Sequence, residues 1–296
     1  MLSFLKKRNA VPTEVADGPP GEVAANEQGA TTAASEAASI IDAYVTGFPT
    51  AQKAVDLFKG EWSSKLPDEL GVESGTAGLF GDARIVQMVE ALGGIVGASV
   101  LELGPLEGAH TTMVERAGAA SVVAVEANSR AYLKCLIVKE VLGLTKSRFL
   151  LGDINAYMDE TPDRFDICVA SGVLYHQTDP FEMLRLVSKV ANTVLLWTHY
   201  YDAALIGKLP EISEHFTTEP IVRDTGDFEV RYYPRDYRQA LEWTGFCGAG
   251  VERTYWMTRD DIMSSLKLVG FGRLDVLNEN LEHRHGPCFT VLGRKS

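Results

Sequence analysis

The sequence predicts an α/β fold built on a doubly wound, mostly parallel β-sheet. Short apolar segments rich in β-branched residues alternate with segments of helical periodicity, and lie at 99–103, 121–126, 148–153, 164–171 and 192–198. Several of them are apolar at nearly every position, which is typical of strands buried on both faces of a parallel sheet. The strand–helix alternation indicates right-handed crossover connections, as in doubly wound folds.

Helix signals lie between these strands. After Asn128 the periodicity predicts a helix that ends at Gly143. Its expected inward residues are apolar and helically spaced: Leu133, Leu136, Ile137 and Val141. Asp179 and Pro180 provide an N-cap and a first helical position for the helix before the fifth strand.

The remaining chain divides into a tail, an extension and an insert. Residues 1–39 are rich in Ala, Glu, Gly, Pro and Thr without apolar periodicity, which predicts a disordered tail. Residues 40–94 predict a helical N-terminal extension, and residues 95–296 the main α/β domain. Within that domain, residues 200–255 break the repeat and predict an insert. Two final strands, at 272–278 and 287–293, are expected to form an antiparallel hairpin at the sheet edge.

Composition narrows the class of protein. The chain has 296 residues, 46% of them hydrophobic, and a net charge of −12, which argues against a broad nucleic-acid-binding or anionic-membrane surface. No stretch has the length and freedom from charge of a membrane span, and the first residues lack the pattern of a secretory signal. The four cysteines are far apart, with no C-x-x-C pair, and are expected to be reduced. A cytoplasmic protein without membrane contact is therefore expected.

Acidic residues follow three successive strands, at the sheet edge where open α/β folds bind ligands. The candidate binding residues at these strand ends are Glu102, Gly104, Gly108, Glu126, Ala127, Asp153, Ile154 and Ser171. Glu126 follows the glycine turn by about 20 residues, the separation at which an acid accepts ribose hydroxyls. Asp153 is then placed to accept from an exocyclic amine such as that of adenine.

The order E-x-G-x-x-x-G, V-V-A-V-E, G-D and F-D-I-C-V-A-S-G-V-L-Y-H resembles that of the Rossmann-like S-adenosylmethionine-dependent methyltransferases. The resemblance covers about residues 80–200, and residues 258–293 also fit. It implies S-adenosylmethionine as cofactor and a seven-stranded sheet whose last strand is inserted antiparallel. It also implies residue roles: Glu102 for the methionine amino group, Gly104 and Gly108 for close backbone approach, Glu126 for the ribose, and Asp153 with Ile154 for the adenine.

The departure from the G-x-G-x-x-G turn of dinucleotide-binding proteins has a physical reason. A dinucleotide carries a pyrophosphate, which binds at the bare amides of a helix N-terminus. S-adenosylmethionine carries an ammonium and a sulfonium but no phosphate, so Glu102 beside the turn is favourable. Glu107, inside the turn, is expected to repel a phosphate.

The acceptor end is predicted from the segment after the fourth strand. G-V-L-Y-H resembles the corresponding segment of the tRNA wobble-uridine carboxymethyltransferases and related small methyltransferases, which implies that Tyr175 faces the methyl group. Gln177 and Thr178 depart from that family's cations. His176 and His199 end adjacent strands, and histidine is the usual general base near neutral pH. The catalytic candidates are thus His199, which we favour, His176 and Tyr175, with packing or structural hydrogen bonding as the alternative for each.

Other side chains receive simpler interpretations. The aromatic residues and arginines of the insert predict a substrate cover, with packing of the insert on the sheet as the alternative. His110 is expected to border the cofactor, and His283 and His285 to lie on the surface. No His/Asp cluster has metal-ligand spacing, so no metal is expected.

The function expected from these residues is methyl transfer from S-adenosylmethionine by in-line displacement, to a small-molecule or glycan-like acceptor. Two alternatives keep the same fold: a tRNA- or RNA-modifying methyl- or carboxymethyltransferase, and a catalytically inactive cofactor-binding interaction protein. The acceptor, the methylated atom and the oligomeric state stay open.

Overall fold

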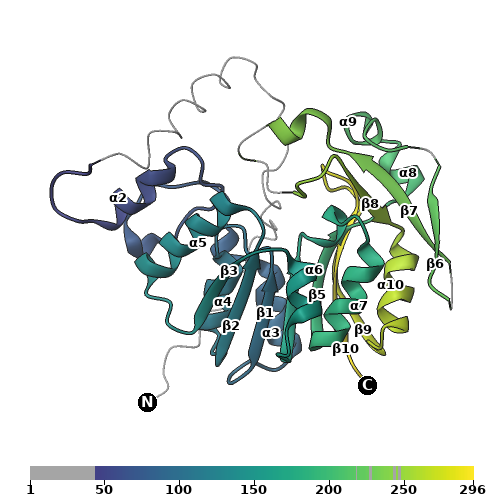
Figure 1. Cartoon of the computed structure of the whole chain (residues 1–296), viewed down its shortest axis with the longest axis horizontal. Helices are drawn as coiled ribbons and strands as arrows, with labels where there is room; N and C mark the ends of the chain where they lie inside the picture. Colours follow the sequence, from purple (N-terminus) through teal and green to yellow (C-terminus); the bar gives the residue numbers. More distant parts are fainter. Residues whose placement is uncertain (1–43, 218, 227–228, 243–244, 246–247) are drawn as a thin grey trace, which may run out of the picture.

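The computed structural model describes residues 44–217, 219–226, 229–242, 245 and 248–296. A central β-sheet has helices on both faces, and a smaller sheet lies to one side of it (Figure 1). The tail predicted at 1–39, and the first four residues of the predicted extension, lie outside the described residues. Among the helices that the structure describes, none combines the length and the apolar character needed to cross a membrane.

The central sheet has seven strands in the order β3-β2-β1-β4-β5-β10-β9. Their bounds are β1 (Ser99–Leu103), β2 (Ser121–Glu126), β3 (Ser147–Leu151), β4 (Phe165–Ser171), β5 (Ala191–His199), β9 (Arg273–Asn280) and β10 (Cys288–Arg294). Strands β1 to β5 pair in parallel, and β10 runs antiparallel between β5 and β9. The doubly wound, mostly parallel sheet is confirmed, and strand order reverses between β1 and β4, where such sheets bind ligands.

Helices cover the two faces in separate layers. The first layer contains α3 (Ala83–Ala91), α4 (Ala109–Arg116) and α5 (Ser129–Leu142), and the second α6 (Ile154–Glu160), α7 (Pro180–Val190) and α10 (Arg259–Leu268). Alternate residues of each strand point into the two layers. In β1, Val100 packs in the core cluster of α3 and α4, whereas Leu101 packs in that of α6, α7 and α10. The near-continuous apolar runs of the sequence follow from this two-sided burial.

Helix α5 buries a face that matches the expected one only in part. Ile137 packs half-buried against the cluster of Phe58 and Trp62, as expected. The buried residues of the helix are Ala131, Lys134, Cys135 and Val138, whereas Leu133 and Leu136 are 49% and 38% exposed. The reason is electrostatic as well as steric, because the Lys134 ammonium lies 3.0 Å from Oε1 of the buried Glu107. The helix is thus oriented by an ion pair together with small side chains, and not by its most apolar stripe.

The N-terminal extension contains less α-helix than predicted. Before α3 the described chain has one short α-helix, α2 (Ala51–Val55), and three 3₁₀ turns, at Asp56–Phe58, Asp68–Leu70 and Leu79–Gly81. Glycines with positive φ at Gly60 and Gly71 interrupt the periodicity. The segment packs on α5, where Phe58 and Trp62 share a buried cluster with Val138.

The insert forms two short helices, a three-stranded antiparallel sheet and a 3₁₀ helix. Its elements are α8 (Ala203–Ile206), α9 (Pro210–Ser213), β6 (Ile221–Asp224), β7 (Glu229–Asp236), the 3₁₀ helix Arg238–Glu242, and β8 (Arg253–Met257). Some of its aromatic residues serve packing: Tyr233 stacks on Tyr201 at 3.7 Å, and the Tyr232 hydroxyl donates to Asp179 at 2.8 Å. Trp243 and Phe246, also predicted as substrate cover, lie outside the described residues.

The turn after β1 has an unusual backbone. Gly104, Leu106 and Gly108 have φ angles of +64°, 55° and +75°. A Cβ on Gly104 would lie 2.7 Å from Cγ1 of Val173, and one on Gly108 would lie 3.1 Å from Cζ of Phe149. Leu106 pays a conformational cost that glycine avoids, and its N–H donates to the Glu126 carboxylate at 3.0 Å. The acid at the end of β2 therefore holds the turn that follows β1.

Glu107 joins this turn to the N-terminal extension. Its buried carboxylate accepts from the N–H groups of Ser63 and Ser64 at 3.0 and 2.7 Å, and pairs with Lys134. The expectation that Glu107 repels a phosphate needs correction, because the Lys134 cation balances its charge. Glu107 fixes the extension against the site.

Replacing Glu107 by Ala should lower the free energy of unfolding by about 3–5 kcal/mol, because the Lys134 cation and two main-chain N–H groups lose their buried partner. Urea unfolding measures the change. Glu182→Ala is the control, because its pair with Arg185 is largely exposed and contributes only about 0–1 kcal/mol. Equal losses in the two variants would contradict the anchoring role.

Replacing Gly104 by Ala should destabilise the protein more than replacing Gly143, which has the same φ of +64° but has nothing within 4 Å of a new Cβ. Both variants place alanine in a left-handed conformation, at about 1–2 kcal/mol. Only Gly104→Ala also overpacks against Val173, at about 1–3 kcal/mol more. Urea midpoints compare the two, and indistinguishable midpoints would show that the contact relaxes without cost.

Candidate functional site

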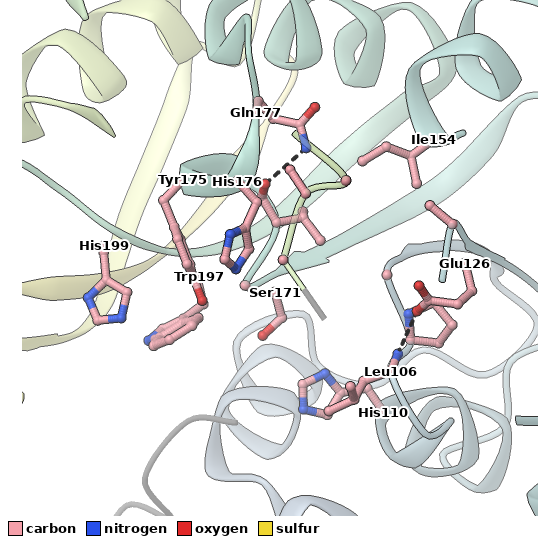
Figure 2. Close-up of a pocket in the computed structure, with 18 of the residues that line it drawn as sticks. Leu106, His110, Glu126, Ile154, Ser171, Tyr175, His176, Gln177, Trp197 and His199 are labelled. Carbon is pink, nitrogen blue, oxygen red and sulfur yellow. Dashed lines mark hydrogen bonds between the residues drawn. The ribbon is translucent and has the colours of Figure 1, made fainter. Parts of the chain in front are cut away.

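A cavity of about 330 Å³ lies at the carboxyl ends of the parallel strands. Nine of the predicted site residues line it: Gly104, Glu126, Ala127, Asp153, Ile154, Ser171, Tyr175, His176 and His199. In Figure 2, Glu126 and Leu106 lie at one end, and His199, Trp197 and Tyr175 at the other, with Ser171 and His176 between them. Glu102 and Gly108 are not among the lining residues.

Glu126 is held at the first end by main-chain donors. Its Oε1 accepts from the Asn128 N–H at 2.8 Å and its Oε2 from the Leu106 N–H at 3.0 Å. Burial raises the pKa of Glu126 to about 7, although these main-chain hydrogen bonds lower it. A carboxylate has about four lone-pair sites, so Glu126 retains acceptors for further donors in the cavity.

Glu102 lies behind His110 rather than on the cavity wall. The Thr111 hydroxyl donates to its carboxylate, and its Oε1 lies 3.9 Å from Nδ1 of His110, which lines the cavity. Burial raises the pKa of Glu102, against an opposing effect of His110. Glu102 thus reaches the cavity through His110, whose other ring nitrogen lies 2.9 Å from Asp82.

The middle of the cavity carries polar groups with spare capacity. Asp153 caps α6 by accepting from the Ala156 N–H at 2.8 Å through Oδ1, which leaves Oδ2 for another donor. Within the described part of the chain, the buried Oγ of Ser171 and Oδ1 of Asn155 have no hydrogen-bond partner. Buried polar atoms normally have partners, so these two atoms indicate the position of a polar ligand.

Aromatic rings enclose the far end. The Tyr175 ring lies 4.9 Å from that of His199 and 5.8 Å from that of Trp256, and the His199 ring stacks on Trp256 at 5.1 Å. Trp197 closes a further side, 5.2 Å from His199. Mostly aromatic walls with few polar groups are typical of small-molecule pockets. Trp197 and Trp256 were not predicted, because each reads as an ordinary buried strand residue.

The two histidines predicted to be catalytic have different hydrogen-bond partners at Nδ1. Nδ1 of His199 lies 2.9 Å from the Gly286 carbonyl oxygen, to which it must donate, so Nε2 of the neutral ring holds a lone pair. Nδ1 of His176 contacts the Tyr237 hydroxyl, which itself receives the Thr254 hydroxyl proton. The direction of the hydrogen bond between His176 and Tyr237 depends on the tautomer of His176. The geometry makes Nε2 of His199 an acceptor or ligand.

Two arginines contribute to the acceptor end. Arg84, only 5% exposed, lies with its guanidinium 4.5 Å from the Trp197 ring centroid and pairs with Asp82. Arg235 lies over the rings of Tyr237 and Trp256, at 5.0 and 5.6 Å. Arg84 belongs to the extension, far from any strand end, so no strand-end signal could have found it.

The expected surface position of His283 is wrong. His283 is 7% exposed and lies beside His199, with ring centroids 5.0 Å apart; His285 is half-buried and lines the same cavity. Cys288 is directly opposite His199 in the pairing of β10 with β5. The expectation of no metal-ligand cluster also needs correction, because the described residues contain one group, formed by His199, His283 and Cys288. The spacing of these residues in the sequence does not reveal the group, because the pairing of β10 with β5 brings them together.

Comparison with known proteins identifies the domain. Residues 96–233 match the family model described as a methyltransferase domain. No curated protein sequence matches the chain.

Solved structures share the fold. The N-terminal domain of EvdMO1, crystallised in the presence of SAH and D-fucose, is 22% identical with a TM-score of 0.62, over 83% of this chain and 95% of that one. Magnesium protoporphyrin IX methyltransferase (ChlM) from Synechocystis PCC 6803, with bound SAH, is 15% identical with a TM-score of 0.50, over 90% and 96% of the two chains. The family match shows that the chain contains a methyltransferase domain, and the strand order together with these likenesses shows its Rossmann-like class I fold.

Proposed function

We propose that this protein transfers a methyl group from S-adenosylmethionine to a hydroxyl group of a small-molecule or glycan-like acceptor. The observation that carries the proposal is the two-ended cavity, with a main-chain-anchored acid at one end and an aromatic, histidine-containing chamber at the other. The structure of the EvdMO1 N-terminal domain in the presence of SAH and D-fucose supports the same classes of cofactor and acceptor. The net charge of −12 does not favour a nucleic acid.

The residues at the first end suit the cofactor. Glu126 would accept the ribose hydroxyls, Asp153 the adenine amine through Oδ2, and Ile154 would pack on the ring. Ser171 and Asn155 offer unpaired oxygens. The cofactor supplies a methyl group on a positively charged sulfur. The protein would orient the two reactants and exclude water from them.

At the acceptor end, His199, His176 and Tyr175 would each have a different role. The lone pair on Nε2 of His199 would attract the proton of the acceptor hydroxyl. Nε2 of His176 would form a hydrogen bond with another hydroxyl group of the acceptor. The Tyr175 ring, 8% exposed, would border the methyl group and pack against the acceptor.

Glu126→Ala should weaken S-adenosylhomocysteine binding about 10- to 100-fold, because hydrogen bonds to a charged group contribute about 1.5–3 kcal/mol. Isothermal titration calorimetry measures the affinity. Glu140→Ala, an exposed acid on α5 away from the cavity, should leave it unchanged. An unchanged affinity for Glu126→Ala would disprove the ribose assignment.

The same acid should make binding pH-dependent. Because the pKa of Glu126 lies at about 7, the unliganded protein holds the neutral acid increasingly as pH falls below that value. Ribose hydroxyls donate best to the ionised form, so affinity should fall by up to about tenfold per pH unit below pH 7. Glu126→Gln should lose that component, whereas equal slopes in the two proteins would assign the pH dependence to groups other than Glu126.

His199→Ala should lower the rate of S-adenosylhomocysteine release with hexose acceptors, D-fucose included, by about 100-fold or more. Cofactor affinity should stay unchanged, because His199 lies at the other end of the cavity. His215→Ala is the control, since His215 does not line the cavity. Full turnover in His199→Ala would exclude this residue from the reaction.

A further inference from the structure

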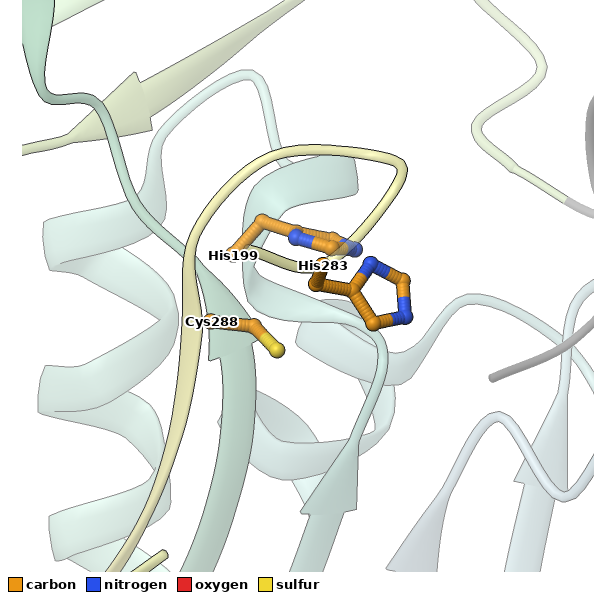
Figure 3. Close-up of side chains that lie close together, drawn as sticks. All are labelled: His199, His283 and Cys288. Atoms are coloured by element: carbon orange, nitrogen blue, oxygen red, sulfur yellow. The ribbon is translucent and has the colours of Figure 1, made fainter. Parts of the chain in front are cut away.

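Three side chains that can bind a metal ion converge at the acceptor end. The ligand atoms of His199, His283 and Cys288 all lie within 4.8 Å of one another, and all three residues are buried (Figure 3). His199 ends β5 and Cys288 begins β10 directly opposite it, so both point to one face of the sheet. His283 comes from the loop between β9 and β10. The group thus combines two strands and a loop that are far apart in sequence.

We propose that His199, His283 and Cys288 form a binding site for a transition-metal ion of the Zn²⁺ class, with one coordination position open to the acceptor cavity. Three protein ligands with a vacant fourth position are the arrangement of catalytic zinc sites. His199 and His283 both line the cavity, so a ligand there can reach the open position.

A hydrogen bond gives the His199 imidazole the form that binds metals. Nδ1 of His199 donates to the Gly286 carbonyl oxygen at 2.9 Å, which leaves the lone pair on Nε2. A main-chain carbonyl that holds the other ring nitrogen is the usual support of a metal-binding histidine. Nδ1 of His283 accepts the His285 N–H at 3.2 Å, so it also holds a lone pair, and a metal ion would replace this long hydrogen bond.

The donor set selects the class of ion. Two imidazole nitrogens and one sulfur suit Zn²⁺ and its neighbours, whereas Mg²⁺ and Ca²⁺ prefer oxygen ligands. Burial raises the pKa of Cys288 to about 11, against an opposing effect of a hydrogen bond with Trp197, so the metal-free site holds a thiol. Metal binding would displace that proton. Arg84 adds a nearby positive charge, but its ion pair with Asp82 compensates it.

The use of this metal rests on the proposed function, whereas metal binding itself does not. With the metal bound, Nε2 of His199 is a ligand, and it no longer accepts the acceptor proton as it would in the metal-free site. The acceptor hydroxyl would bind at the open position, which lowers its pKa so that its proton passes to water. The oxygen then forms a bond to the methyl carbon of the cofactor. The carbon–sulfur bond breaks, and its electron pair stays on sulfur.

Cobalt(II) provides the test, because its spectrum reports thiolate ligation without any measurement of activity. Titration of the reduced full-length protein with Co²⁺ should give one equivalent bound, a sulfur-to-cobalt charge-transfer band, and strong visible bands typical of four-coordination. Zn²⁺ should displace the Co²⁺ and abolish both. Cys288→Ser should lose the charge-transfer band, and His283→Gln should weaken Co²⁺ binding by about 100-fold or more.

Matched variants keep the outcome decisive. Cys168→Ala removes a buried cysteine of β4 outside the group, and His215→Ala a histidine outside the cavity, and both should keep the full spectrum. Circular dichroism establishes that each variant is folded. A folded wild type with no thiolate–cobalt band, or a Cys288→Ser variant that keeps it, would overturn the proposal. Methyl transfer that persists after Zn²⁺ removal would leave the site standing and remove only its catalytic use.

Discussion

The antiparallel pairing of β10 with β5 is the constraint on which the acceptor end depends. It places Cys288 opposite His199 and continues to Arg294 opposite Thr193, so β10 is paired with β5 along its own whole length. A slip of one residue would turn every β10 side chain to the other face of the sheet. Phe289 and Val291 would then leave the core beneath α7 and α10, so the packing of the core also sets the position of Cys288.

The same pairing determines the chemistry of His199. The loop that enters β10 supplies the Gly286 carbonyl oxygen, which selects the ring tautomer, and His283, which lies against the ring. Trp256 from β8 stacks on the same ring. These contacts make His199 a buried, neutral imidazole with its lone pair on Nε2. The buried imidazole of His283 and the thiol of Cys288 lie beside this lone pair, and such a group can hold a metal ion.

The cofactor end is built by a different principle, because its parts are nearly local. Glu126 orients the turn after β1 through the Leu106 N–H, and the next residue in that turn, Glu107, anchors the N-terminal extension. The extension in turn supplies Arg84 and Leu79 to the cavity wall. Two acids that look alike in sequence thus have different tasks: one keeps acceptor capacity within the cavity, and the other is neutralised by Lys134.

The sequence alone determined the five parallel strands, the strand-end acids, the glycine turn and the positions of His176, His199 and Tyr175, because period, caps and turns are local properties. It was right only in part for helix α5, where an ion pair with Glu107 overrides the apolar stripe, and it failed for His283, whose neighbours become visible only in three dimensions. Tertiary structure decided which acid faces the cavity, which tautomer His199 adopts, and that His199, His283 and Cys288 meet. Strand register and side-chain packing over long sequence separations set these features, and no local pattern encodes them.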